Sequence, residues 1–160
     1  MEPIIASIHE LLEKESKAVL NIPIADDYEK AVDLIVEQVH KKKGKLVTTG
    51  MGKAGQIAMN IATTFCSTGI PAVFLHPSEA QHGDLGILQE NDVMLLISNS
   101  GKTREILELT QLAHVLNPHL KYIVITGRRV VHAQTAPPRI GLTLCGVYAP
   151  RPKDVQDPPL

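Results

Sequence analysis

The stretch LVTTGMGKAG at residues 46–55 decides the fold. It is a short apolar strand that runs into a glycine turn, and the helical sequence IAMNIATTF (57–65) follows directly. Glycines permit positive φ and let the backbone approach a ligand closely, while the first turn of a helix supplies free N–H groups for an anion. This order of strand, glycine turn and helix therefore predicts a ligand-binding turn in an α/β domain.

Four further apolar segments alternate with helix-length stretches after this turn. They lie at 72–75, 93–97, 122–126 and 141–147. Apolar runs without polar alternation are typical of strands buried on both faces, so we expect a five-stranded parallel sheet with helices on each side. Ligands of such sheets bind beyond the carboxyl ends of the strands, so the functional residues should follow the strands.

Residues 1–44 carry two amphipathic helical patterns with a break at Pro23, and the second pattern ends in three lysines before Gly44. We expect these helices to pack on a core formed by residues 45–147. Residues 148–160 are rich in proline and lack apolar periodicity, which predicts an extended or disordered tail. No internal repeat is present.

Composition excludes several classes of function. The chain has 160 residues with 44% hydrophobic residues, and its formal net charge of -1 provides no basic field for nucleic acid or an anionic membrane. The longest apolar runs are far shorter than a membrane-spanning helix, and the N-terminal sequence carries acids where a signal peptide has basic residues. We therefore expect a cytoplasmic protein with neither a nucleic-acid nor a membrane partner.

The glycine turn also fits a dinucleotide fingerprint, and this alternative is weakened by the second strand. That strand ends in Leu75, His76 and Pro77, with no acidic residue to bind ribose hydroxyls. A P-loop is excluded because Val47 stands where its first glycine is required and Ala54 follows Lys53.

The segment SNSGKT at 98–103 follows the third strand and precedes a helix. Its hydroxyl and amide side chains surround a glycine at a helix N-terminus, which predicts a neutral cradle for a phosphate monoester. In a doubly wound sheet this segment and the first glycine turn converge near one crevice. The candidate phosphate-binding residues are Gly52, Ser98, Asn99, Ser100, Gly101 and Thr103.

The polar segment HPSEAQHGDLG (76–86) contains two histidines, Glu79 and Asp84. We expect an 11-residue loop, and a loop of this length in a compact domain is usually functional. The histidine spacing matches no standard zinc pattern, so we predict no metal site, with His82 the residue to consider if one exists. His82 is instead a candidate for the active site.

These three loops together, GMGKAG, FLHPSEAQHGDLG and SNSGKTREIL, resemble the sugar isomerase (SIS) domain of the D-arabinose 5-phosphate isomerases. That family acts in lipopolysaccharide and capsule biosynthesis. The resemblance implies a three-layer αβα sandwich of flavodoxin-like type, a homo-oligomer (dimer or tetramer), and interconversion of arabinose 5-phosphate with ribulose 5-phosphate without a cofactor. It also implies that Lys53, His82 and Glu105 are catalytic.

The implied chemistry suits these residue types, because aldose and ketose interconvert through a cis-enediol. Glu105 would be the base, Lys53 would neutralise the enediolate or the phosphate, and His82 would move protons between the oxygens or help to open the ring. The sequence departs from the family at Ala54, which is usually Ser, and at Lys102, which is mostly Glu.

A further departure lies at the C-terminus. The segment CGVYAPRPKDVQDPPL (145–160) stands where the family continues with further acid and base residues, and we expect none of the CBS modules that many members carry. We therefore expect an isomerase whose activity is impaired or completed by a neighbouring subunit; the alternative is a non-catalytic, regulatory phosphosugar-binding domain.

Overall fold

A computed structural model describes residues 2–127 and 142–145. The tail expected at 148–160 and both ends of the strand expected at 141–147 lie outside the described residues. The described chain forms two units, of which the first contains residues 2–23 and the second Ile24–Cys145. The boundaries expected at 44/45 and 147/148 stay a prediction.

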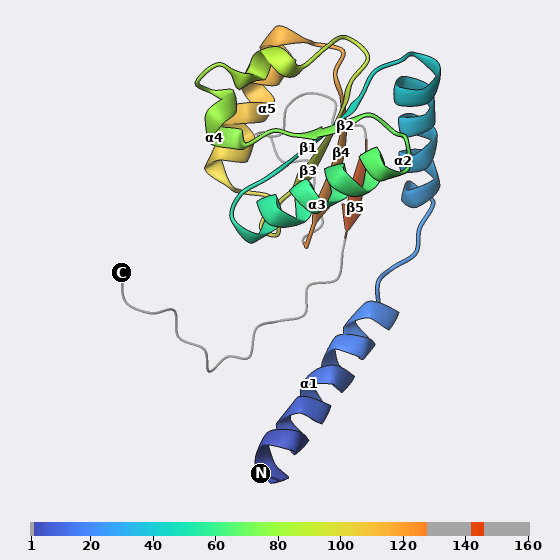
Figure 1. Cartoon of the computed structure of the whole chain (residues 1–160), viewed down its shortest axis with the longest axis vertical. Coiled ribbons are helices and arrows are strands. Elements are labelled where there is room, and N and C mark those ends of the chain that lie inside the picture. The colour runs from blue at the N-terminus through green and yellow to red at the C-terminus, as the bar shows by residue number, and fades with distance from the viewer. Residues whose placement is uncertain (1, 128–141, 146–160) are drawn as a thin grey trace. The chain divides into compact units, whose positions relative to one another are not determined.

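The second unit is built on a five-stranded sheet with the order β2-β1-β3-β4-β5, and every pairing is parallel (Figure 1). This order is that of flavodoxin-like doubly wound folds. The α/β class and the parallel sheet predicted from the apolar runs are thereby confirmed. The strands are β1 (Leu46–Gly50), β2 (Ala72–Phe74), β3 (Val93–Ile97), β4 (Lys121–Thr126) and β5 (Leu142–Cys145).

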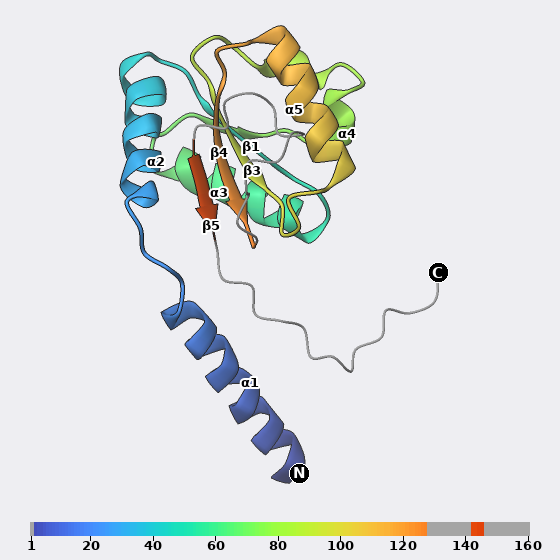
Figure 2. The same cartoon turned by 180° about the vertical axis from the view of Figure 1, so that it is seen from behind.

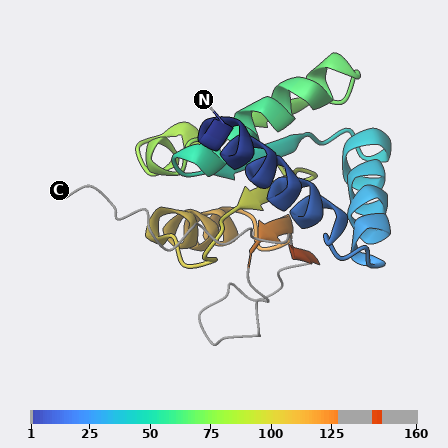
Figure 3. The ribbon, with the colours of Figure 1, turned by 90° about the horizontal axis from the view of Figure 1, so that it is seen from below.

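Helices cover both faces of the sheet, as Figures 2 and 3 show from behind and from below. One face carries α2 (Asp27–Ile35), its π-helical continuation η1 (Val36–Lys41) and α3 (Lys53–Ser67), and the other carries α4 (Pro77–Ala80) and α5 (Arg104–Leu116). The second N-terminal helix therefore ends within the lysine run before Gly44, as its sequence predicts. Its π-helical last turn was not predicted.

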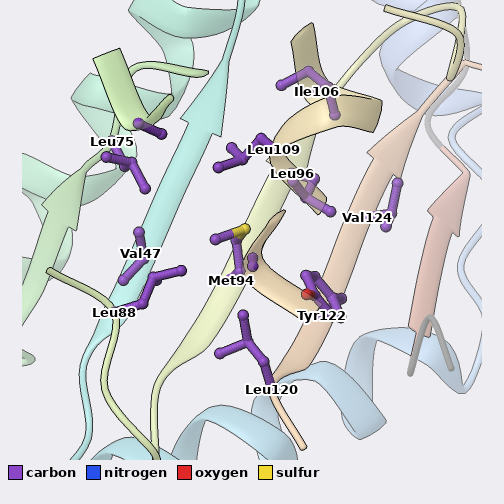
Figure 4. Packing of buried hydrophobic residues seen from close by; sticks show 12 residues of the cluster. Val47, Leu75, Leu88, Met94, Leu96, Ile106, Leu109, Leu120, Tyr122 and Val124 are labelled. Carbon is purple, nitrogen blue, oxygen red and sulfur yellow. The ribbon is translucent and has the colours of Figure 1, made fainter. Parts of the chain in front are cut away.

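Successive side chains of β1, β2, β3 and β4 enter opposite cores, because side chains in a strand alternate between faces. Val47, Met94 and Leu96 pack with Leu109 of α5 (Figure 4), whereas Leu46, Val93 and Leu95 lie in the second core with Ala31 of α2. All of these side chains are buried. The two cores hold α3 and α5 on opposite sides of the same strands.

The expectation that residues 76–86 form an 11-residue loop is wrong in part. Pro77–Ala80 form the single-turn helix α4, and Asp84–Ile87 form the 3₁₀-helix η2. Proline suits the first position of a helix because that position needs no N–H partner and its φ is already helical. Ala80 is also 2% exposed and packs into the core with α5, which holds the turn in place.

The first unit contains the helix α1 (Glu2–Leu20). Ion pairs between Glu10 and Lys14 (2.6 Å) and between Glu13 and Lys17 (3.6 Å) connect successive turns. This helix confirms the first amphipathic pattern. Among the residues that the structure describes, no helix is both long and apolar enough to cross a membrane.

Candidate functional site

The glycine turn and the 98–103 loop begin side by side. β1 and β3 are neighbours in the sheet, and their last residues, Gly50 and Ile97, are paired in register. Both strands are parallel, so the two loops leave the same carboxyl edge of the sheet. The structure thus brings together the two segments that the sequence indicates as phosphate-binding.

The glycine turn places the start of α3 directly on the end of β1. A Cβ atom at Gly55 would lie 2.6 Å from the carbonyl oxygen of Gly50, so only glycine allows this approach. Gly52 precedes α3 with a φ of +55°, and a Cβ there would meet nothing within 4 Å. The backbone at Gly52 is therefore open to a ligand, and Lys53 begins the helix next to it.

Hydroxyl groups shape the 98–103 loop from within. The Ser98 hydroxyl accepts a hydrogen bond from the Gly101 N–H (3.2 Å) and is hydrogen-bonded to the Thr103 hydroxyl (3.0 Å). The Ser100 hydroxyl accepts from the Lys102 N–H (3.1 Å). Gly101 has a φ of +65°, which glycine adopts without strain. These contacts fix the loop before any ligand binds.

Backbone contacts anchor the same loop to β4. The Ser98 N–H donates to the Ile125 oxygen (3.0 Å), and the Gly127 N–H donates to the Asn99 oxygen (3.2 Å). The Thr126 hydroxyl also donates to the backbone carbonyl oxygen of Asn99 (3.3 Å). Thr103 then occupies the N-cap position of α5 in an extended conformation, so the first N–H groups of α5 lie at the end of the loop.

The three candidate catalytic residues follow the ends of β1, β2 and β3. Lys53 is the first residue of α3 and is exposed, and Glu105 is half-buried in the first turn of α5. His82 is exposed between α4 and η2, where its backbone N–H donates to the backbone carbonyl oxygen of Glu79 (2.9 Å). Neither Lys53 nor His82 has an ion-pair partner among the described residues. The structure thus places all three at the edge that binds ligands in this class of fold.

Two polar side chains near this edge were missed by sequence reasoning. His76 occupies the N-cap position of α4, two residues after β2, and its Nδ1 is buried without a hydrogen-bond partner in the described part of the chain. The same holds for the Thr49 hydroxyl, whereas the neighbouring Thr48 hydroxyl donates to Ala58 (2.7 Å). The position of His76 at a strand end is the signal that identifies it as a candidate.

No three His, Cys, Asp or Glu side chains within residues 2–127 and 142–145 are placed to hold a metal ion. The carboxyl edge carries hydroxyls, backbone N–H groups and the ammonium groups of Lys53 and Lys102, beside the Glu105 carboxylate and the two histidines. The donors and cations suit an anionic ligand with hydroxyl groups.

This fold and this edge define the class of doubly wound α/β domains, which bind ligands beyond the carboxyl ends of their strands. The SIS domain family matches residues 38–135, and the chain belongs to that family.

Relatives and solved structures agree with this assignment. The chain is 47% identical over 98 residues to the arabinose 5-phosphate isomerase KdsD of Francisella tularensis, a match of 61% of this chain and 30% of that protein. The chain thus spans about a third of the length of the curated relatives it matches.

Two solved structures share the fold over most of the chain. A Bacteroides fragilis protein assigned as a phosphosugar isomerase involved in capsule formation is 74% identical, with a TM-score of 0.84 over 89% of this chain and 73% of that one. An Escherichia coli CFT073 protein solved in complex with arabinose 5-phosphate is 36% identical, with a TM-score of 0.72 over 91% of this chain and 74% of that one.

Proposed function

We propose that this chain is a phosphosugar aldose–ketose isomerase that interconverts D-arabinose 5-phosphate and D-ribulose 5-phosphate. One observation carries the proposal: the loop shaped by Ser98 and Thr103 leaves the sheet beside the glycine turn, at paired ends of β3 and β1. If the phosphate binds at this loop, the sugar carbons would extend toward Lys53 and Glu105. The names of the relatives and the sugar-phosphate complex of the Escherichia coli protein support this choice of substrate.

The reaction needs a base, because a proton must leave the carbon next to the carbonyl. In the proposed mechanism the Glu105 carboxylate removes the C2 proton of open-chain arabinose 5-phosphate and the electron pair forms the C1–C2 double bond of a cis-enediol. The carbonyl oxygen gains a proton while the O2 hydroxyl loses one, and Glu105 returns its proton to C1 to give ribulose 5-phosphate. No cofactor is needed because the substrate is oxidised at one carbon and reduced at the next.

The other two residues serve the oxygens. The Lys53 ammonium stabilises the negative charge that develops on the enediolate or remains on the phosphate. His82 transfers protons between the two oxygens or assists ring opening, since an imidazole ring has one nitrogen that donates a proton and one that accepts it. The phosphate contacts come from Gly52 and the loop residues Ser98, Asn99, Ser100, Gly101 and Thr103. The protein would act as a homo-oligomer in the cytoplasm, in capsule or lipopolysaccharide biosynthesis.

The test is a coupled assay with ribulose 5-phosphate, run beside a binding measurement with arabinose 5-phosphate. We expect turnover by the wild-type chain and exchange of solvent deuterium into C2, which reports the enediol directly. Glu105→Gln keeps the shape of the side chain without its basicity, so binding should survive while turnover and exchange fall about a hundredfold. Binding without any exchange by the wild type would contradict the proposal and favour a regulatory phosphosugar-binding domain. An active Glu105→Gln would place the base elsewhere.

A further inference from the structure

One hydrogen-bonded trio joins the neighbours of two candidate catalytic residues. The Glu108 carboxylate accepts from Arg104 Nε at 2.6 Å through Oε1 and from Gln81 Nε2 at 3.1 Å through Oε2. Arg104 precedes Glu105 in the sequence, and Gln81 precedes His82. A single carboxylate thus connects the backbone that carries the proposed base with the backbone that carries the proposed proton carrier.

The other restraints on the segment around His82 lie on either side of it. α4 is only one turn long, and a single helical turn is not stable without tertiary contacts. Pro77 and Ala80 are buried before His82, Ala80 in the core with α5, and Leu85 packs against the same core after it. Beyond it the chain turns at Gly83, whose φ of +134° is a glycine conformation. Gln81 is therefore the last side chain before His82 that connects this segment to α5.

We propose that Glu108 is a positioning residue that clamps the His82 segment to the first turns of α5. The proposal rests on the proposed function for the roles of His82 and Glu105. Glu108 lies one turn beyond Glu105 on α5, where it acts through Gln81 and Arg104 rather than by touching substrate. Without the carboxylate, His82 would no longer be held in a fixed place relative to the base.

Hydrogen bonds keep the Glu108 carboxylate in its ionised form. The hydrogen bonds from Arg104 and Gln81 lower the pKa of Glu108, so its carboxylate stays an acceptor for both donors throughout the neutral range. The Glu108 side chain is 35% exposed and that of Arg104 85% exposed, so solvent screens the interaction. We therefore expect a contribution to catalysis through geometry and a small one to stability.

The chain offers a matched control in Glu37. This carboxylate also has two cationic partners, Lys41 at 3.0 Å and Lys42 at 3.8 Å, and its side chain is 44% exposed. It lies on η1, on the opposite face of the sheet from α5. Glu37→Ala therefore removes a comparable surface interaction that has no connection to His82.

The first measurement is amide hydrogen exchange on the folded chain without ligand. The amides of Ala80, Gln81 and His82 donate to carbonyls of residues 76–79, so their protection reports how well the segment is held. Glu108→Ala should speed their exchange about fivefold or more, an increase in local opening that Glu37→Ala should not produce. Equal exchange in the two variants would overturn the proposal.

The second measurement is steady-state kinetics. Glu108→Ala should lower kcat about tenfold and leave KM within about twofold, because the 98–103 loop is untouched and a small displacement of a catalytic group lowers rate. Gln81→Ala should have the same effect, and the double variant should lose no more than either single variant. Gln81→Lys should keep the wild-type kcat, since an ammonium group also donates to Glu108. In the Glu108→Ala background the acceptor is gone, so Gln81→Lys should leave kcat at the low value of Glu108→Ala.

Additive losses, or a kcat for Glu108→Ala equal to that of Glu37→Ala, would refute the positioning role. Amide hydrogen exchange is measured without turnover, so the positioning role of Glu108 and the proposed isomerase function can be refuted separately. An inactive wild type would refute the proposed function, whereas the clamp would then be decided by exchange alone.

Discussion

Lys45 and Asp92 are joined twice, since the Lys45 backbone N–H donates to Asp92 Oδ1 at 2.9 Å and the Lys45 ammonium donates to Oδ2 at 2.7 Å. The Gln89 N–H donates to the same carboxylate at 2.8 Å. The Asp92 side chain is fully buried, and the Lys45 side chain is 20% exposed. The carboxylate thereby ties the residue before β1 to the turn before β3, at the amino edge of the sheet.

Asp92→Ala should destabilise the fold by about 3 kcal/mol, because it leaves two backbone N–H groups and a partly buried ammonium without their acceptor. Urea unfolding followed by circular dichroism measures this loss. The affinity for sugar phosphate should not change, because the site lies at the opposite edge of the sheet. An unfolding free energy equal to that of the wild type would show that the pair contributes nothing to stability.

Gly55→Ala should disturb the site and the fold together. Its Cβ would lie 2.6 Å from the Gly50 oxygen, a backbone atom that cannot move aside without shifting β1 or α3. Overpacking of this kind costs about 2 kcal/mol, and the shift would also displace Lys53. We expect lower stability and weaker binding of arabinose 5-phosphate, measured by urea unfolding and calorimetry.

Gly86→Ala is the matched control for this change. A Cβ at Gly86 would meet nothing within 4 Å, and its φ is not in the positive range. Its stability and its ligand affinity should equal those of the wild type or rise slightly, as when Ala replaces Gly at a compatible position. A loss of affinity as large as that of Gly55→Ala would show that the close approach of α3 to β1 is not the cause.

The strands could be predicted from the sequence because a buried parallel strand leaves a local signal, an unbroken apolar run such as 93–97. The placement of the glycine turn and the 98–103 loop at one edge then followed from parallel topology. The helix α4 could not be found this way, because it depends on Ala80 packing against α5 from a distant part of the chain.

The hydrogen-bond partners of side chains also could not be predicted from the sequence. The contact between Gln81 and Glu108 joins residues 27 positions apart, and no periodicity marks it. The hydroxyl pair of Ser98 and Thr103 lies within one loop, yet it requires the turn that Gly101 allows. The catalytic roles of Lys53, His82 and Glu105 stay predictions.

Ser100→Ala and Ser98→Ala should separate ligand contact from loop shape. Ser100 is exposed and accepts from the Lys102 N–H alone, so its removal should weaken sugar-phosphate binding by about 1 to 3 kcal/mol, the cost of a hydrogen bond to a charged group, and lower stability less than Ser98→Ala does. Ser98 is 4% exposed and holds Gly101 and Thr103, so its removal should lower affinity and stability together. An unchanged dissociation constant in both variants would remove this loop from the site.

Tyr122 makes stability depend on alkaline pH. Its side chain is 2% exposed in the core beside Met94, and its hydroxyl has no hydrogen-bond partner among the described residues (Figure 4). Burial raises the pKa of this phenol from 10.0 to about 12. The folded state therefore retains a proton that the unfolded state releases above pH 10.

The sign of the pH effect follows from this difference in bound protons. Where the folded state binds more protons than the unfolded state, stability falls as pH rises. The stability should be complete below pH 10 and should fall between pH 10 and pH 12, by about 2 to 3 kcal/mol for a shift of two units. Urea unfolding at a series of pH values from 8 to 12 measures the slope, with circular dichroism as the probe because the chain contains no Trp.

Tyr122→Phe tests the assignment of this slope. The variant should unfold at neutral pH with the stability of the wild type or up to about 1 kcal/mol more, because it removes a buried hydroxyl that lacks a partner. Its alkaline loss of stability should be smaller by the part that Tyr122 contributes. Tyr28, which is 39% exposed on α2, provides the control, and Tyr28→Phe should keep the wild-type slope. A Tyr122→Phe variant with the full alkaline slope would assign the loss to other groups, and a strongly destabilised one would show that the hydroxyl has a partner in the folded protein.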